Sequence, residues 1–196
     1  MLFRSAASVA MLDVPAVLDR AQGDVHPGGN PHVHLDARNI AQIAAALGER
    51  IAQLDAADAV GHRARTRDFL ERWRAALARW EAQAAPLKGM ALVVYHKNLS
   101  YLLAWLGMRE AGALEPKPGL PPTASHLAQL LEAQKRDPAK AIVLASYNDP
   151  RGGAWLAEHA KLPVLVLPFT VGGNDRVKDL FGLFDDSIAR LLAVNK

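Results

Sequence analysis

The 196-residue chain is 51% hydrophobic and carries a formal net charge of +3, so it can bury the core of one domain or two small lobes. It has no cysteine, which excludes disulfides and thiolate metal ligands. Its arginines are scattered along predicted helices without a basic block, so we expect no nucleic-acid partner. No apolar run approaches the roughly 20 residues that a membrane span needs.

The N-terminal third predicts a loop followed by two helices. Residues 1–31 show little periodicity, and their first 15 residues make a poor secretory signal, so we expect either no export or a missing true N-terminus. Asp36 is a good N-cap for an amphipathic helix that ends near Leu54. A second helix is predicted from about 57 to 84 and is about 40 Å long, which would suit a strut between two lobes or a long packing helix. Its apolar stripe comprises Phe69, Leu70, Trp73, Leu77 and Trp80.

From residue 87 onward, strands alternate with helices. This order predicts a parallel sheet with helices on both faces. The expected strands are Ala91–Tyr95, Ala111–Leu114, Ala141–Ser146 and Val164–Leu167, and the expected helices are Leu99–Leu106, Thr123–Arg136, Pro150–Ala160 and Val177–Val194.

Histidines and carboxylates near strand ends are the candidates for chemistry. His26, His32 and His34 crowd into one loop, and neutral imidazole is a common ligand for divalent transition metals. If that loop is extended, His32 and His34 point to opposite sides. His96 ends the first strand and is therefore expected at the binding crevice of the sheet. The carboxylates Asp149 and Glu115 also follow strands, although the pattern favours a helix N-cap as the role of Asp149.

Several segments together resemble one family. GNPHVHLDARN, VVYHKNLSYLLAWLG, LEPKPGLPPTASHLAQL and SYNDPRGGAWLAEHAKLPVLVLPFTVGG resemble, in order, segments of the periplasmic zinc/manganese solute-binding proteins of ABC transporters. The resemblance implies two α/β lobes joined by one long helix, with the metal held between the lobes.

The resemblance also implies a ligand set. The family's second and third ligands match His32 and His96, and His34 departs from the family pattern as a possible extra ligand. The family's first histidine lies in an N-terminal lobe that this chain is expected largely to lack. Its fourth ligand falls near Phe169–Gly172, where no carboxylate stands, so Asp149 and Asp175 are the nearest substitutes.

We therefore predict an α/β fold in which a parallel-sheet C-terminal lobe is joined by a long backbone helix to a partial N-terminal lobe. The predicted divisions are a remnant of the N-terminal lobe (1–55), the connecting helix (56–86) and the C-terminal lobe (87–196). Without the rest of the first lobe, part of the apolar helix stripe should be exposed.

The predicted function is an extracytoplasmic, non-enzymatic and monomeric receptor that captures Zn²⁺ or Mn²⁺ and delivers it to an ABC permease. Its predicted metal ligands are His32 and His96, followed by His34, His26 and Asp149. Two alternatives stay open at this point. One is a metal-dependent amidohydrolase that uses the HxH at 32–34, although a (β/α)₈ barrel needs about 250 residues. The other is a truncated remnant without metal function.

Overall fold

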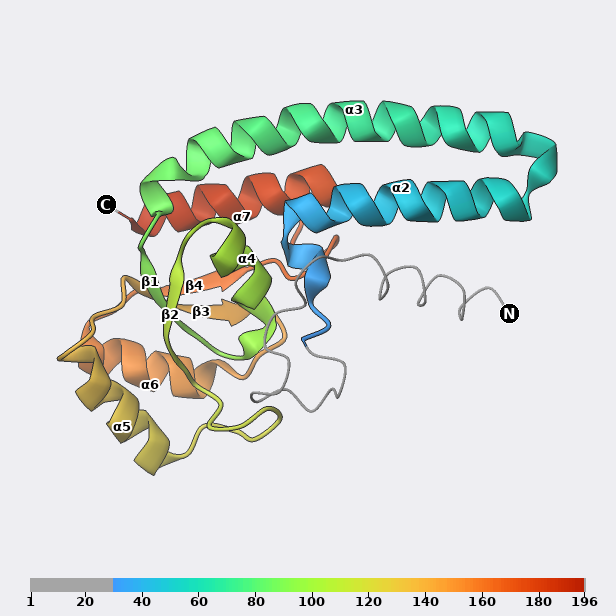
Figure 1. Ribbon diagram of the computed structural model, residues 1–196. Coiled ribbons are helices and arrows are strands. Elements are labelled where there is room, and N and C mark those ends of the chain that lie inside the picture. The colour runs from blue at the N-terminus through green and yellow to red at the C-terminus, as the bar shows by residue number, and fades with distance from the viewer. Residues whose placement is uncertain (1–29, 196) are drawn as a thin grey trace.

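The computed structural model describes residues 30–195, which contain a four-stranded parallel sheet with helices on both faces (Figure 1). The strands lie in the order β2-β1-β3-β4, so β1 and β3 are central. Every residue of these two strands is buried, as expected for parallel strands covered on both faces. The strands span Ala91–Val94 (β1), Arg109–Ala113 (β2), Ala141–Ala145 (β3) and Val164–Leu167 (β4).

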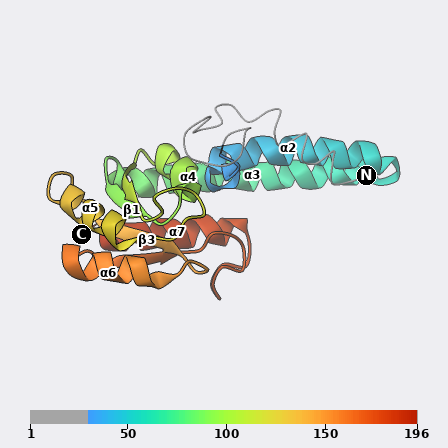
Figure 2. The same ribbon diagram turned by 90° about the horizontal axis from the view of Figure 1, so that it is seen from below.

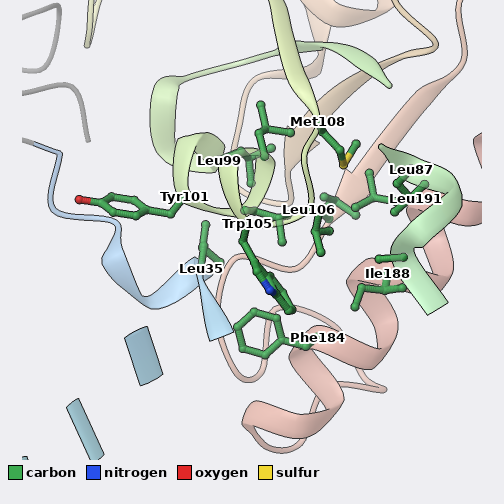
Figure 3. Close-up of a cluster of buried hydrophobic side chains, with 14 of the residues drawn as sticks. Leu35, Leu87, Leu99, Tyr101, Trp105, Leu106, Met108, Phe184, Ile188 and Leu191 are labelled. Carbon is green, nitrogen blue, oxygen red and sulfur yellow. The ribbon is translucent and has the colours of Figure 1, made fainter. Parts of the chain in front are cut away.

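Two hydrophobic clusters fill the space on the two sides of the sheet. Side chains alternate along a strand, so Leu92 and Val94 of β1 enter one cluster and Val93 enters the other. The first cluster, part of which Figure 3 shows, contains side chains of α3 (Ala59–Ala84), α4 and α7, and the second contains side chains of α5 and α6; Figure 2 shows where these helices lie. The bounds of the four helices that follow strands are Ser100–Trp105 (α4), Ala124–Gln134 (α5), Pro150–Ala160 (α6) and Leu180–Val194 (α7).

The two longest helices form an antiparallel hairpin that projects beyond the sheet (Figure 1). They are α2 (Ala37–Leu54) and α3 (Ala59–Ala84), joined through the short 3-10 turn η2 (Ala56–Asp58). Asp36 caps α2 by accepting a hydrogen bond from the backbone N–H of Arg38. With 26 residues, α3 is about 40 Å long. No helix among residues 30–195 is long and apolar enough to cross a membrane.

The apolar face of α2 is covered near its start and exposed toward its end. Ile40 is 7% exposed, whereas Leu47 is 38%, Ile51 is 37% and Leu54 is 52% exposed. The exposure expected from the sequence concerned the stripe of α3, where Trp73 and Trp80 are buried at 0% exposure, so the exposed apolar side chains lie on α2 instead. The predicted division of the chain at residues 55 and 86 stays a prediction. In the structure, α2 and α3 pack along each other as one hairpin.

Among the element boundaries that differ from the sequence prediction, two have identifiable reasons. The last helix begins at Leu180, not at Val177, because Asp179 is its N-cap and accepts a hydrogen bond from the N–H of Gly182. β2 begins at Arg109, two residues before the predicted start, because its register with β1 pairs Arg109 with Ala91. Hydropathy could not show this start, since the first residues of β2 are exposed.

Candidate metal centre

The carboxyl end of each strand delivers one side chain to the same edge of the sheet. His96 follows β1, Glu115 follows β2, Tyr147 follows β3 and Phe169 follows β4. In parallel α/β sheets this edge is where ligands bind. His32 reaches the same edge from the N-terminal segment, immediately before the 3-10 turn η1 (Val33–Leu35).

The imidazole rings of His32 and His96 lie next to each other in an edge-to-face arrangement. Their ring centroids lie 5.6 Å apart and their planes are inclined by 82°. Two imidazoles bound to one tetrahedral Zn²⁺, each through a nitrogen about 2.0–2.1 Å from the metal, place their centroids roughly 5 Å apart. The observed spacing is therefore compatible with one shared ion.

Each of these rings has an oxygen partner at its Nδ1 atom. Nδ1 of His96 lies 2.7 Å from Oε2 of Glu115, and the same oxygen accepts a hydrogen bond of 3.2 Å from the N–H of Gly119. Nδ1 of His32 lies 2.7 Å from Oδ1 of Asn30. Oxygen acceptors favour a proton on Nδ1 of each ring, and that tautomer leaves the lone pair of the neutral ring on Nε2. Histidines that bind a metal through one ring nitrogen usually donate a hydrogen bond from the other nitrogen to an oxygen of this kind.

His34 is placed differently from the expectation of opposite directions. Residues Val33–Leu35 form a 3-10 turn and are not extended, so both His32 and His34 contact the ring of Phe169, with centroid distances of 5.5 and 5.0 Å. Nε2 of His34 lies 3.2 Å from the backbone oxygen of Phe169. Burial lowers the pKa of His34, against the opposing effect of this hydrogen bond, so the neutral ring is favoured.

Phe169 occupies the region after the last strand where the resemblance implies a carboxylate ligand. Its ring contacts His32, His34 and Tyr147, the last at a centroid distance of 5.7 Å. The hydroxyl of Tyr147 accepts a hydrogen bond of 3.1 Å from Nδ2 of Asn98. The aromatic ring of Phe169, in contact with the ring of Tyr147, therefore lies beside the histidines at this position.

The remaining sequence candidates are not gathered around the histidine pair. Asp149 caps α6 through the N–H of Arg151, and the Arg151 guanidinium lowers the pKa of Asp149 to about 2. Asp175 lines a groove beside α7 with Arg176 and Asp186. His26 lies outside the described residues. Within residues 30–195, no three His, Asp or Glu side chains are grouped so that they could hold a metal ion.

Sequence reasoning missed Asn30, and it treated Glu115 only as a carboxylate at a strand end. The structure makes Glu115 the partner of His96. Asn30 is only 1% exposed, although it lies in a loop rich in glycine and proline. A short polar residue two positions before a candidate ligand was the available signal, but its burial depends on the tertiary fold.

A family model described as "zinc-uptake complex component A, periplasmic" (ZnuA) matches residues 3–193 of the chain. The match spans nearly the whole sequence and includes both histidine segments. A search of curated proteins found no match.

Several solved structures share the fold at low sequence identity. The solute-binding protein FpvC from Pseudomonas aeruginosa, solved with Mn²⁺, has a TM-score of 0.73 and 20% identity, covering 95% of this chain and 67% of its own. The Cd-bound periplasmic metal-binding protein from Candidatus Liberibacter asiaticus has a TM-score of 0.75 and 15% identity, with coverages of 95% and 70%. The laminin-binding adhesin Lmb from Streptococcus agalactiae, solved as a mutant, has a TM-score of 0.69 and 17% identity, with coverages of 89% and 67%.

Proposed function

Because the chain belongs to the family of periplasmic zinc-uptake complex components, we propose that it captures a divalent transition metal outside the cytoplasm and delivers it to an ABC permease. Family members of this kind are transport receptors and not enzymes. The observation that carries the proposal within this chain is the pairing of His32 with His96 at the carboxyl edge of the sheet.

In the proposed site, His32 and His96 bind one metal ion through their Nε2 atoms. The hydrogen bonds at Nδ1 support this assignment, because they hold the protons on the nitrogens that face the protein. Two imidazoles leave about two positions of a tetrahedral ion for water or for further protein ligands. The chain spans 67–70% of the solved receptors described above, so the complete ligand set belongs to this proposal as well.

The proposed metal is Zn²⁺ in preference to Mn²⁺. Imidazole nitrogen suits Zn²⁺, whereas Mn²⁺ favours oxygen ligands, and nitrogen sites generally bind Zn²⁺ more tightly than Mn²⁺. The ring of Phe169 supports this choice, because it stands where a carboxylate oxygen would otherwise favour the harder ion. Competition between Zn²⁺ and Mn²⁺ for the same chromophoric chelator measures this preference, and equal or tighter binding of Mn²⁺ contradicts it.

Zinc titration of single and double variants tests the site. We expect His32→Ala and His96→Ala each to weaken Zn²⁺ binding by at least tenfold. The double variant should lose high-affinity Zn²⁺ binding altogether. His159→Ala is the matched control, because His159 is an exposed histidine on α6 that stacks on Trp155. Unchanged Zn²⁺ affinity in the double variant rejects the assignment of His32 and His96 as ligands. If the unmodified chain binds no Zn²⁺, the result supports the alternative of a remnant without metal function.

The hydrolase alternative finds less support in the geometry. An amidohydrolase HxH site needs both His32 and His34 on one ion, but Nε2 of His34 contacts the backbone oxygen of Phe169. The sheet formed by the described residues is open and four-stranded, whereas that enzyme class uses an eight-stranded barrel. An amide-hydrolysis panel with Zn²⁺ present should therefore show no turnover. We also propose a monomer, which light scattering coupled to size-exclusion chromatography measures.

A further inference from the structure

We propose that Asn30 is a positioning residue that sets both the spacing of the two histidines and the nitrogen that His32 presents to the metal. The inference rests on the proposed metal site and adds a residue outside its ligand set. Asn30 is 1% exposed, so its amide group must find its hydrogen-bond partners within the protein.

The side chain of Asn30 links the two segments that carry the histidines. Its Nδ2 donates a hydrogen bond of 2.7 Å to the backbone oxygen of Lys97, the residue next to His96. Its Oδ1 accepts a hydrogen bond of 3.0 Å from the backbone N–H of His32 and lies 2.7 Å from Nδ1 of the same residue. One amide group therefore bridges the loop after β1 and the segment before η1.

The backbone of Asn30 is held in place as well. Its carbonyl oxygen accepts a hydrogen bond of 2.9 Å from the hydroxyl of Tyr101. Tyr101 is 1% exposed, and Figure 3 shows its hydroxyl extending from α4 toward the segment that precedes η1. The backbone of Asn30 is thus held by a residue of α4, the helix that follows His96 in the sequence.

The polarity of these contacts determines the tautomer of His32. A backbone N–H can only donate and a backbone carbonyl can only accept, so His32 N–H and Lys97 C=O fix which end of the Asn30 amide is oxygen. The amide oxygen then faces Nδ1 of His32, which must carry a proton to form that hydrogen bond. In this tautomer the lone pair of the neutral ring lies on Nε2, the nitrogen that binds the metal in the proposed site.

The consequence is a site whose two nitrogens are arranged before the metal arrives. Ligands must be held within about 0.5 Å of their productive geometry for full affinity. His32 and His96 come from segments far apart in the sequence, and Asn30 is the side chain that bonds to both segments. Outer-shell partners of this kind typically change metal affinity by about 10–100-fold when they are removed.

Two substitutions separate the two roles of the amide. Asn30→Asp keeps an oxygen acceptor for His32 but replaces the donor to Lys97 with a second oxygen, so it should keep the His32 tautomer and lose the bridge. Asn30→Ala removes both. Asn39→Asp is the matched control, because Asn39 is also buried at 5% exposure and its Nδ2 donates a hydrogen bond to a backbone oxygen, that of Val33.

The measurements are the ring-nitrogen NMR spectrum of the metal-free chain near pH 8 and Zn²⁺ affinity by chelator competition. We expect the Nδ1–H tautomer for His32 in the unmodified chain and in Asn30→Asp, a shift toward Nε2–H in Asn30→Ala, and Zn²⁺ affinity at least tenfold weaker in both. Asn39→Asp should change neither the tautomer nor the affinity by more than about twofold.

An Nε2–H tautomer of His32 in the unmodified chain overturns the inference even if no variant folds. Unchanged Zn²⁺ affinity in both Asn30 variants also overturns it, while the His32 and His96 ligands stand. If the unmodified chain binds no Zn²⁺, the proposed function fails. Comparison of the metal-free NMR spectra of the unmodified chain and Asn30→Ala then still decides whether Asn30 sets the tautomer of His32.

Discussion

Glu115 and His96 stand at the ends of neighbouring strands, and a hydrogen bond of 2.7 Å joins Oε2 of Glu115 to Nδ1 of His96. Both side chains are largely buried, at 14% and 22% exposure. A carboxylate in this position orients the ring and increases the basicity of Nε2, the nitrogen that would bind the metal in the proposed site. We expect Glu115→Ala to weaken Zn²⁺ binding by about 10–100-fold and Glu115→Gln to weaken it less, because the amide oxygen still accepts the hydrogen bond.

Chelator competition measures these affinities, and Glu132→Gln is the control. Glu132 is an exposed carboxylate on α5 whose ion-pair partner is Lys135, so its substitution should leave Zn²⁺ binding unchanged. If Glu115→Ala binds Zn²⁺ as tightly as the unmodified chain, Glu115 is not part of the site.

Asp186 should make the chain sensitive to acid. Burial alone would raise the pKa of Asp186, but hydrogen bonds from Arg190 and Asn174 outweigh that effect and hold the pKa below its ordinary value. A carboxyl whose folded-state pKa is lowered stabilises the fold above its unfolded pKa, and this stability is lost as pH falls through the folded pKa. We expect Asp186→Asn to lower the free energy of unfolding by roughly 1–3 kcal/mol at pH 7 and by much less at pH 2.

Urea unfolding at the two pH values measures this difference. Asp68→Asn is the control, because Asp68 forms an exposed ion pair with Arg72, and such pairs contribute only about 0–1 kcal/mol. An equal loss of stability at pH 7 and pH 2 for Asp186→Asn would show that the charge of Asp186 does not matter to the fold.

The exposed end of the α2 apolar face should bind hydrophobic probes. Leu47 and Leu54 are 38% and 52% exposed, so their replacement by glutamine removes exposed apolar surface at little cost in stability. We expect the double variant to bind less of a hydrophobic dye and to unfold within a few degrees of the unmodified chain. Ile40→Gln, on the same face but at 7% exposure, should instead lower the melting temperature markedly. Unchanged dye binding in the double variant would contradict this account.

Much of the α/β architecture could be predicted from local patterns in the sequence. The strands Ala141–Ala145 and Val164–Leu167 are short apolar runs between turn signals, and Asp149 with Pro150 marks the start of α6. The start of β2 escaped prediction because its exposed residues carry no hydropathy signal, and its position depends on pairing with β1.

The site could be predicted only in part. A strand end and a resemblance located His96 and His32, because those signals are local in the sequence. The 3-10 turn after His32, the ring of Phe169 beside it and the bridge through Asn30 all depend on contacts between distant segments. No local sequence pattern encodes such contacts, so the roles of Phe169 and Asn30 could be recognised only from the three-dimensional structure.

The most direct test of the central claim is an anomalous difference map from a crystal of this chain grown with Zn²⁺. We predict one peak between His32 and His96, about 2.0–2.1 Å from Nε2 of each ring. A peak bonded to only one of these rings, a peak at Nδ1 of either ring, or zinc bound solely elsewhere on the chain would contradict the account.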